Sequence, residues 1–176
     1  MKTPKAILLG GVALGLFVTP MLLLDRTYAA SRTIAIPTLP SSVEGRLRDL
    51  DGWARWGPLL GRVDGAPELS AEAVEARWPE LGSGATSIRI VSLEATDGGA
   101  VMRYALEGGT ALADHHGTIT ITEIEGANTS VRWEALGEVG PMPWSRFGGL
   151  MRGAVLEADV EDCLARLRGE FLGSPN

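Results

Sequence analysis

The longest apolar stretch of the chain lies at its start, where Ala6 to Leu24 form a run of nineteen positions without a charged side chain. At about 1.5 Å rise per residue, a helix of this length spans roughly 28 Å, close to the roughly 30 Å hydrocarbon thickness of a bilayer. Pro20 does not exclude a membrane helix, because neighbouring groups can satisfy the backbone that it leaves unpaired. We therefore predict one N-terminal transmembrane helix, or anchor, in residues 1–26.

The charges that flank this run predict its orientation. Lys2 and Lys5 precede it, whereas Asp25 and Arg26 follow it, and this basic bias favours a cytoplasmic N-terminus. The alternative is a signal peptide cleaved after Ala29, although the apolar run exceeds the usual ~7 to 15 residues of a signal core. In both interpretations the remaining residues are exported to the periplasm or the outer surface. If the run is an anchor, the protein is also a single-pass membrane protein.

Residues 27–176 have the size of one domain with its own core. An alternating, β-branched segment at Tyr28–Ile36 predicts the first strand, which the following prolines end. Ser41 and Ser42 are expected to cap a helix. Apolar residues at helical spacing predict that helix and a second short one, closed by a Gly-Pro pair: Val43, Leu47 and Leu50, then Trp53 and Trp56.

Four further segments have the period of two that is typical of strands, after a mixed, turn-like stretch from Arg62 to Ala73 and a short strand at Val74–Trp78. They are Ala85–Glu94, Ala100–Glu107, His115–Glu125 and Thr129–Glu138. Glycine-rich turns separate them, which favours consecutive antiparallel hairpins. The pattern predicts one antiparallel sheet.

Alternation also predicts which side chains face the core. The inner positions are Met102, Tyr104, Leu106, Ile119, Ile121, Val131, Trp133 and Ala135, and their polar neighbours should face water. After Pro143 the period changes to that of a helix, with one predicted apolar stripe of Phe147, Leu150, Met151, Ala154, Ala158, Leu164, Leu167 and Phe171. This stripe should cover the sheet and leave an apolar cavity between the two.

The charge of the exported part disfavours two classes of partner. Beyond Arg26 there are 13 basic and 21 acidic residues, a net charge of −8, which disfavours nucleic acid and anionic lipid surfaces. Cys163 is the single cysteine and cannot form an internal disulfide. We expect it to be buried and inert, because the neighbouring Asp162 opposes thiolate formation.

The order of these elements resembles the START-like helix-grip superfamily, also called SRPBCC or polyketide cyclase/dehydrase-like. The matching segments are Ser31–Pro37, Val43 with Leu47, Trp53–Pro58, Gly82–Ala85, Thr129–Trp133 and Leu156–Leu167. Many bacterial members also carry one N-terminal apolar helix. Two departures are Cys163, where such members often have glycine, and the lack of an aromatic residue soon after Gly84.

The resemblance implies an α+β helix-grip domain, with a curved antiparallel sheet wrapped around a long C-terminal helix, here preceded by the transmembrane helix. It also implies a pocket for a hydrophobic ligand. It does not imply a particular chemistry, because the superfamily includes carriers, enzymes and partner-binding modules.

Few residues are candidates for metal binding or catalysis. Asp114, His115 and His116 form one cluster, yet adjacent strand residues point to opposite faces, so we predict no metal site there. The segment Gly82-Ser83-Gly84 is interpreted as a turn, because it lacks the surroundings of a phosphate loop. We assign no catalytic residue and no cofactor, and the sole conceivable acid/base pair is His115 with Tyr104.

The candidate ligand-binding residues are those on the predicted inner surfaces. They are Tyr104, His115, Trp133, Met102, Ile119, Ile121, Trp53, Trp56, Phe147 and Met151. The sequence thus favours a membrane-tethered domain that binds a hydrophobic small molecule or lipid. A polyketide cyclase or dehydratase and a cell-envelope module for an unknown protein partner remain as alternatives.

Overall fold

The computed structural model describes residues 23–57, 67–70, 72, 74–78, 86–108 and 115–173. Its elements, in chain order, are β1 (Thr27–Ile36), α2 (Pro40–Arg48), α3 (Trp53–Trp56), β2 (Glu68–Leu69), β3 (Glu75–Trp78), β4 (Thr86–Thr96), β5 (Gly99–Gly108), β6 (His115–Ile124), β7 (Asn128–Glu138) and α4 (Pro143–Leu172). Every predicted strand and helix of the domain is present within a few residues of its expected bounds. The two-residue strand β2 is an addition, in a stretch that was expected to be turn-like.

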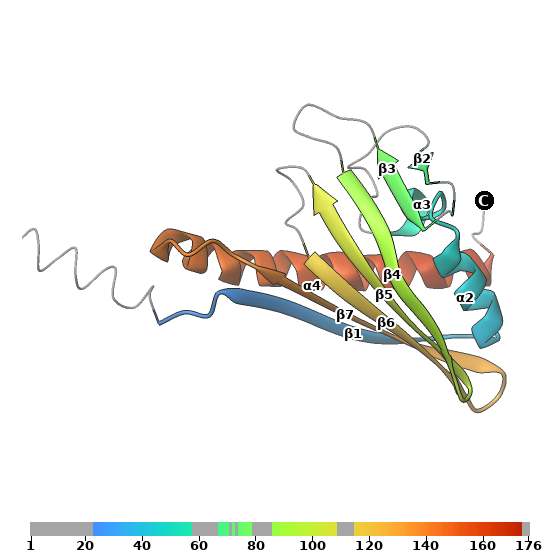
Figure 1. Cartoon of the computed structure of the whole chain (residues 1–176). Coiled ribbons are helices and arrows are strands. Elements are labelled where there is room, and N and C mark those ends of the chain that lie inside the picture. Colours follow the sequence, from blue (N-terminus) through green and yellow to red (C-terminus); the bar gives the residue numbers. More distant parts are fainter. Residues whose placement is uncertain are drawn as a thin grey trace, which may run out of the picture.

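The strands form one antiparallel sheet in the order β1-β7-β6-β5-β4-β3-β2. Strands β4 to β7 are consecutive neighbours, as the meander predicted, and β1 pairs with β7 along its whole length. Gly98, Gly126 and Ala127 have positive φ angles in the two hairpin turns that are described. A register shift between Ile90 and Ser92 adds an irregularity to β4, and the sheet is strongly curved (Figure 1).

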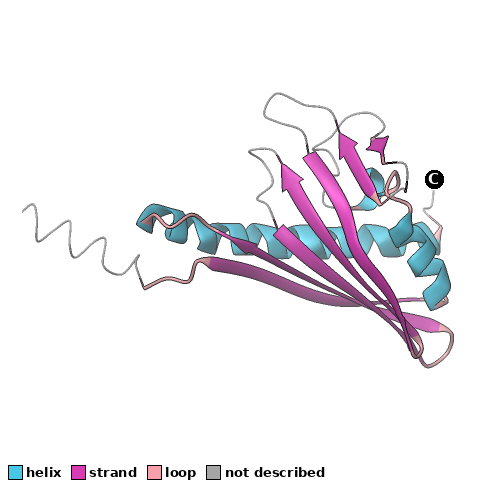
Figure 2. Ribbon diagram, viewed as in Figure 1, coloured by secondary structure: helices cyan, strands magenta, loops and turns pink. Residues whose placement is uncertain are grey.

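The helices pack against the concave side of this sheet (Figure 2). Helix α4 runs along β1 and β7, whereas α2 contacts β5, β6 and β7, and α3 contacts α4. The core lies between these layers and contains all eight residues that alternation placed on the inner face. The α+β architecture with a curved sheet and a long C-terminal helix is therefore confirmed.

The predicted serine cap of α2 is wrong. The helix begins at Pro40, one residue before Ser41, and the N-cap residue that precedes it, Leu39, makes no side-chain capping bond. Proline at the first position explains this start, because its fixed φ suits the helix and its missing N–H needs no acceptor. Val43, Leu47 and Leu50 are buried as the spacing predicted.

The apolar stripe predicted for α4 is wrong in its first half. Phe147, Leu150 and Met151 are more than half exposed, and Ala154 and Ala158 are also exposed. The physical reason is that small residues face β1 and β7 there, so the large side chains lie on another side of the helix. The residues that face the sheet follow a spacing of three and four: Gly149, Gly153, Leu156, Val160, Leu164 and Leu167.

Most of the predicted transmembrane segment, residues 6–22, lies outside the described residues. The proposed turn at Gly82-Ser83-Gly84 and the residue Asp114 also lie outside them. In the part of the chain that the structure describes, no helix is long and apolar enough to cross a membrane.

Candidate functional site

Three polar side chains meet in the apolar interior, one from each of three neighbouring strands. Tyr104 lies on β5, His115 begins β6, and Trp133 lies on β7. The indole Nε1 of Trp133 donates to the Tyr104 hydroxyl oxygen at 2.8 Å, and the same oxygen lies 3.2 Å from His115 Nε2. We call Trp133, Tyr104 and His115 the polar chain. The structure thus joins the acid/base pair that the sequence suggested and adds an indole to it.

Space for the polar chain depends on Gly117. This residue is the direct cross-strand partner of Tyr104. A Cβ atom at Gly117 would lie 2.0 Å from Cε1 and 2.3 Å from the hydroxyl of Tyr104. The tyrosine ring therefore lies over the bare backbone of β6, which directs its hydroxyl toward His115 and Trp133.

Burial determines the protonation of Tyr104. Its side chain is 1% exposed, and loss of solvent raises the pKa of the hydroxyl, with the Trp133 bond acting in the opposite direction. Tyr104 therefore keeps its proton at neutral pH. Because the indole of Trp133 can only donate, the hydroxyl oxygen accepts from it and the hydroxyl proton is available to an unprotonated Nε2 of His115.

Aromatic rings from α3 cover the polar chain. The ring centroid of Trp53 lies 5.3 Å from that of Tyr104 and 6.1 Å from that of Trp133, both in edge-on geometry. The ring of Trp56 lies 6.2 Å from that of Trp133 in edge-on geometry and 5.0 Å from that of Trp53 in a tilted one. The indole N–H of Trp53 donates to the Leu47 carbonyl at 2.9 Å. The short α3 is thereby held between α2 and the sheet.

Eight of the ten candidate ligand residues share this interior. Met102, Ile119 and Ile121 are fully buried on the same sheet face as the polar chain. Phe147 and Met151 are not brought to it, because they lie on the exposed side of α4. A ligand-binding role for any of the ten stays a prediction.

Cys163 is buried on α4, as expected, and interacts electrostatically with Tyr104. The sequence offered no signal for this proximity, which depends on how α4 lies against the sheet.

The two adjacent histidines face opposite sides of β6, as alternation requires. His115 is 4% exposed, whereas His116 is exposed on the other face. Within the described ranges, no group of three histidine, cysteine, aspartate or glutamate side chains is placed to hold a metal ion.

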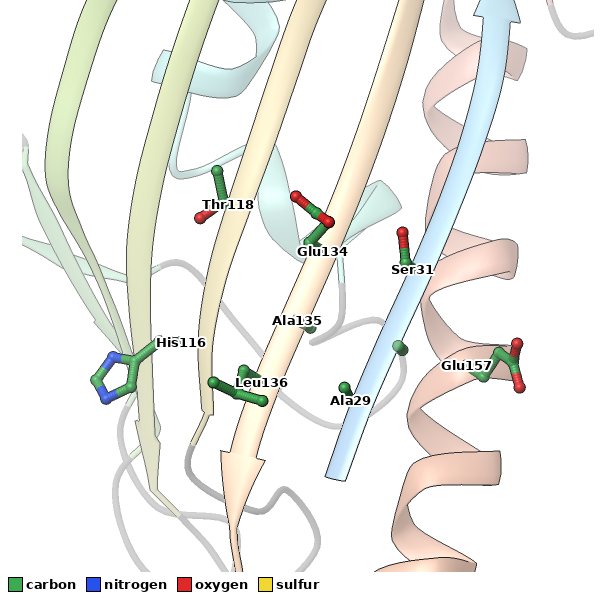
Figure 3. Close-up of a pocket in the computed structure, with 9 residues that line it drawn as sticks. Ala29, Ser31, His116, Thr118, Glu134, Ala135, Leu136 and Glu157 are labelled. Atoms are coloured by element: carbon green, nitrogen blue, oxygen red, sulfur yellow. The ribbon is translucent and has the colours of Figure 1, made fainter. Parts of the chain in front are cut away.

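A groove of about 560 Å³ lies on the outer face of the sheet, away from the polar chain (Figure 3). Cross-strand pairing builds it from two rows, His116–Leu136–Ala29 and Thr118–Glu134–Ser31, with Glu157 of α4 at its side. The sequence reasoning missed this groove. Most of its strand residues are outward positions, for which the alternation predicted only contact with water.

The sequence matches the family described as polyketide cyclase / dehydrase and lipid transport over residues 27–171. The architecture is that of a helix-grip domain, and the chain belongs to this family. The resemblance seen in the sequence is thereby confirmed. No curated protein matches the chain.

Solved structures with the same fold are distant in sequence. The protein XoxI from Bacillus cereus is 12% identical, with a TM-score of 0.60, and the match covers 85% of this chain and 99% of that one. A conserved protein from Geobacillus kaustophilus is 17% identical, with a TM-score of 0.58 and coverage of 83% and 96%. A protein from Thermobifida fusca is 16% identical, with a TM-score of 0.58 and coverage of 81% and 94%. At these identities the likeness concerns the fold alone.

Proposed function

We propose that this domain binds a hydrophobic small molecule or lipid between the sheet and the helices, with the polar chain as the group that orients the ligand. The observation that carries the proposal is a hydrogen-bonded tyrosine, histidine and tryptophan inside an otherwise apolar interior. Ligand sites of this kind are lined by apolar and aromatic side chains, with a few polar atoms that fix orientation. Family membership supports the same ligand class.

The position of the polar chain supports access from one end of the sheet. His115 is the first residue of β6 and Tyr104 lies four residues before the end of β5. Among the described residues, the four-residue helix α3 places its two tryptophans against the rings of Tyr104 and Trp133. A ligand that displaces Trp53 or Trp56 would meet the Tyr104 hydroxyl and the His115 ring directly.

The ligand is held without chemical change in this proposal. Burial raises the pKa of Tyr104, so the hydroxyl stays protonated at neutral pH and can donate a hydrogen bond, but it is a poor source of a proton. The domain is further proposed to be exported and held at a membrane by the N-terminal apolar run. A lipid would then be the nearest source of ligand.

The contact between Tyr104 and His115 favours a second candidate function, a cyclase or dehydratase that acts on a polyketide-like substrate. His115 would be the base and the Tyr104 hydroxyl would polarise a carbonyl oxygen. This function requires a turnover that disappears in His115→Ala while the fold survives.

Native mass spectrometry of the full chain after mild extraction from membranes tests the main proposal. We expect bound lipid with the parent protein and with His116→Ala, the matched control on the outer face, and at least tenfold less with Tyr104→Phe. Recovery of a folded protein with no bound molecule, or equal binding in all three proteins, would contradict the proposal.

A further inference from the structure

Large apolar side chains are exposed along the first half of α4. We call Trp144, Phe147, Met151 and Val155 the α4 apolar patch, and each of them is more than half exposed. Their spacing of three, four and four residues places them on one side of the helix, at about 100° per residue. Gly149 and Gly153 face Val139 and Tyr28 from the opposite side. The helix therefore carries two apolar stripes, and the described residues cover only the one that contains the glycines.

The charge of this region is opposite to that of the rest of the domain. The eighteen residues from Val139 to Leu156 contain two arginines and no acidic residue, in a chain of net charge −6. Acidic residues begin directly afterwards, at Glu157, and two of them pair with Arg32 of β1. Arg152 is exposed, whereas Arg146 is half-buried and reaches the Leu24 carbonyl. An apolar surface with Arg152 beside it and no acidic residue in the same stretch of helix complements an anionic lipid surface.

The patch lies where the apolar N-terminal run meets the domain. Arg146 Nη1 donates to the Leu24 carbonyl at 3.2 Å. The Val139 N–H donates to the Arg26 carbonyl at 2.8 Å, just before α4 begins. In Figure 1 this half of α4 extends past the ends of β4, β5 and β6, beside the start of β1. Leu24, the last residue of the apolar run, is thus attached to the helix that exposes the patch.

From these three observations we infer that the first half of α4 lies on the surface of an anionic bilayer, with the α4 apolar patch at the level of the headgroups. Tryptophan and the other apolar side chains enter the interface, and the exposed Arg152 contacts lipid phosphates. The contact orients the domain on the membrane. It is separate from ligand binding in the interior, because the patch shares no residue with the polar chain.

A fluorescent label at Met151→Cys in the full chain tests the contact. The matched control is Ala165→Cys, at an exposed position in the acidic second half of α4. Native Cys163 is buried. Labelling of the parent protein, which has this cysteine alone, measures how much label Cys163 takes up. Each protein is reconstituted in vesicles of phosphatidylcholine with phosphatidylglycerol, or of phosphatidylcholine alone, with lipids that carry a quencher.

We expect several-fold stronger quenching of the label at position 151 than at position 165. The difference should be larger in vesicles that contain phosphatidylglycerol. Adding Phe147→Ser and Val155→Ser should lower the quenching at position 151 about tenfold. Equal quenching at both positions would overturn the inference. So would a lipid-independent protection of position 151 that rises with protein concentration, because a second copy would then cover the patch. Resistance of the protein to a high-salt wash tests the proposed N-terminal tether separately. A failure of the tether can therefore be distinguished from a failure of the contact between α4 and the bilayer.

Discussion

Replacing Tyr104 with phenylalanine removes one buried hydroxyl and leaves the ring that lies over Gly117. The change deletes the 2.8 Å bond from Trp133 and the 3.2 Å contact with His115. Each hydrogen bond contributes about 1 kcal/mol net, and an indole N–H left without an acceptor in the interior adds a desolvation cost. We therefore expect Tyr104→Phe to lower the free energy of unfolding by about 2 to 3 kcal/mol.

Urea unfolding followed by tryptophan fluorescence and circular dichroism measures this loss, with linear extrapolation to water. A double-mutant cycle with Trp133→Phe isolates the bond between the two side chains, because the packing cost of the smaller ring cancels in the cycle. We expect a coupling free energy of about 1 kcal/mol. A loss below about 0.5 kcal/mol in Tyr104→Phe, with no coupling to Trp133, would refute the assignment of the polar chain.

Three further changes test other parts of the structure. Gly117→Ala should cost more than Tyr104→Phe, roughly 3 kcal/mol or more by chemical denaturation, because the new Cβ overlaps the Tyr104 ring. Gly169→Ala should instead stabilise the domain by about 0.5 to 1 kcal/mol in the same assay, since its Cβ meets nothing within 4 Å in α4. The raised pKa of Tyr104 means that the unfolded chain loses this proton near pH 10 while the folded chain keeps it. Stability should therefore fall above about pH 10, by up to 1.36 kcal/mol per pH unit from this group, and Tyr104→Phe should lack that part of the slope.

The strands were predictable because alternate side chains of each strand face water. Polar and apolar residues therefore alternate along the sequence. Met102 and Tyr104 on β5, and Ile119 and Ile121 on β6, are buried as their alternation indicated. The pairing of Tyr104 with His115 was also foreseeable once both were placed on the same face. The bond from Trp133 was not, because it depends on the ring position that Gly117 permits.

The face of α4 could not be predicted, for a related reason. Hydrophobic periodicity identifies large apolar side chains, whereas close packing against β1 and β7 selects small ones at Gly149 and Gly153. In such a helix the exposed stripe is more hydrophobic than the buried, glycine-containing stripe. Hydrophobicity alone therefore predicts the wrong buried face. The outer groove was missed because its residues, apart from Leu136, are polar or small and belong to no recognised motif.

The pairing of tyrosine with glycine occurs twice in the sheet. Tyr28 on β1 is directly opposite Gly137 on β7, as Tyr104 is opposite Gly117, and a Cβ at Gly137 would lie 2.2 Å from the Tyr28 ring. If β5 slipped by two residues against β6, Tyr104 would face Ile119 or His115 and its ring would have no room. Each pair therefore penalises misaligned strands during folding, and the two pairs together select a single alignment at β5–β6 and at β1–β7.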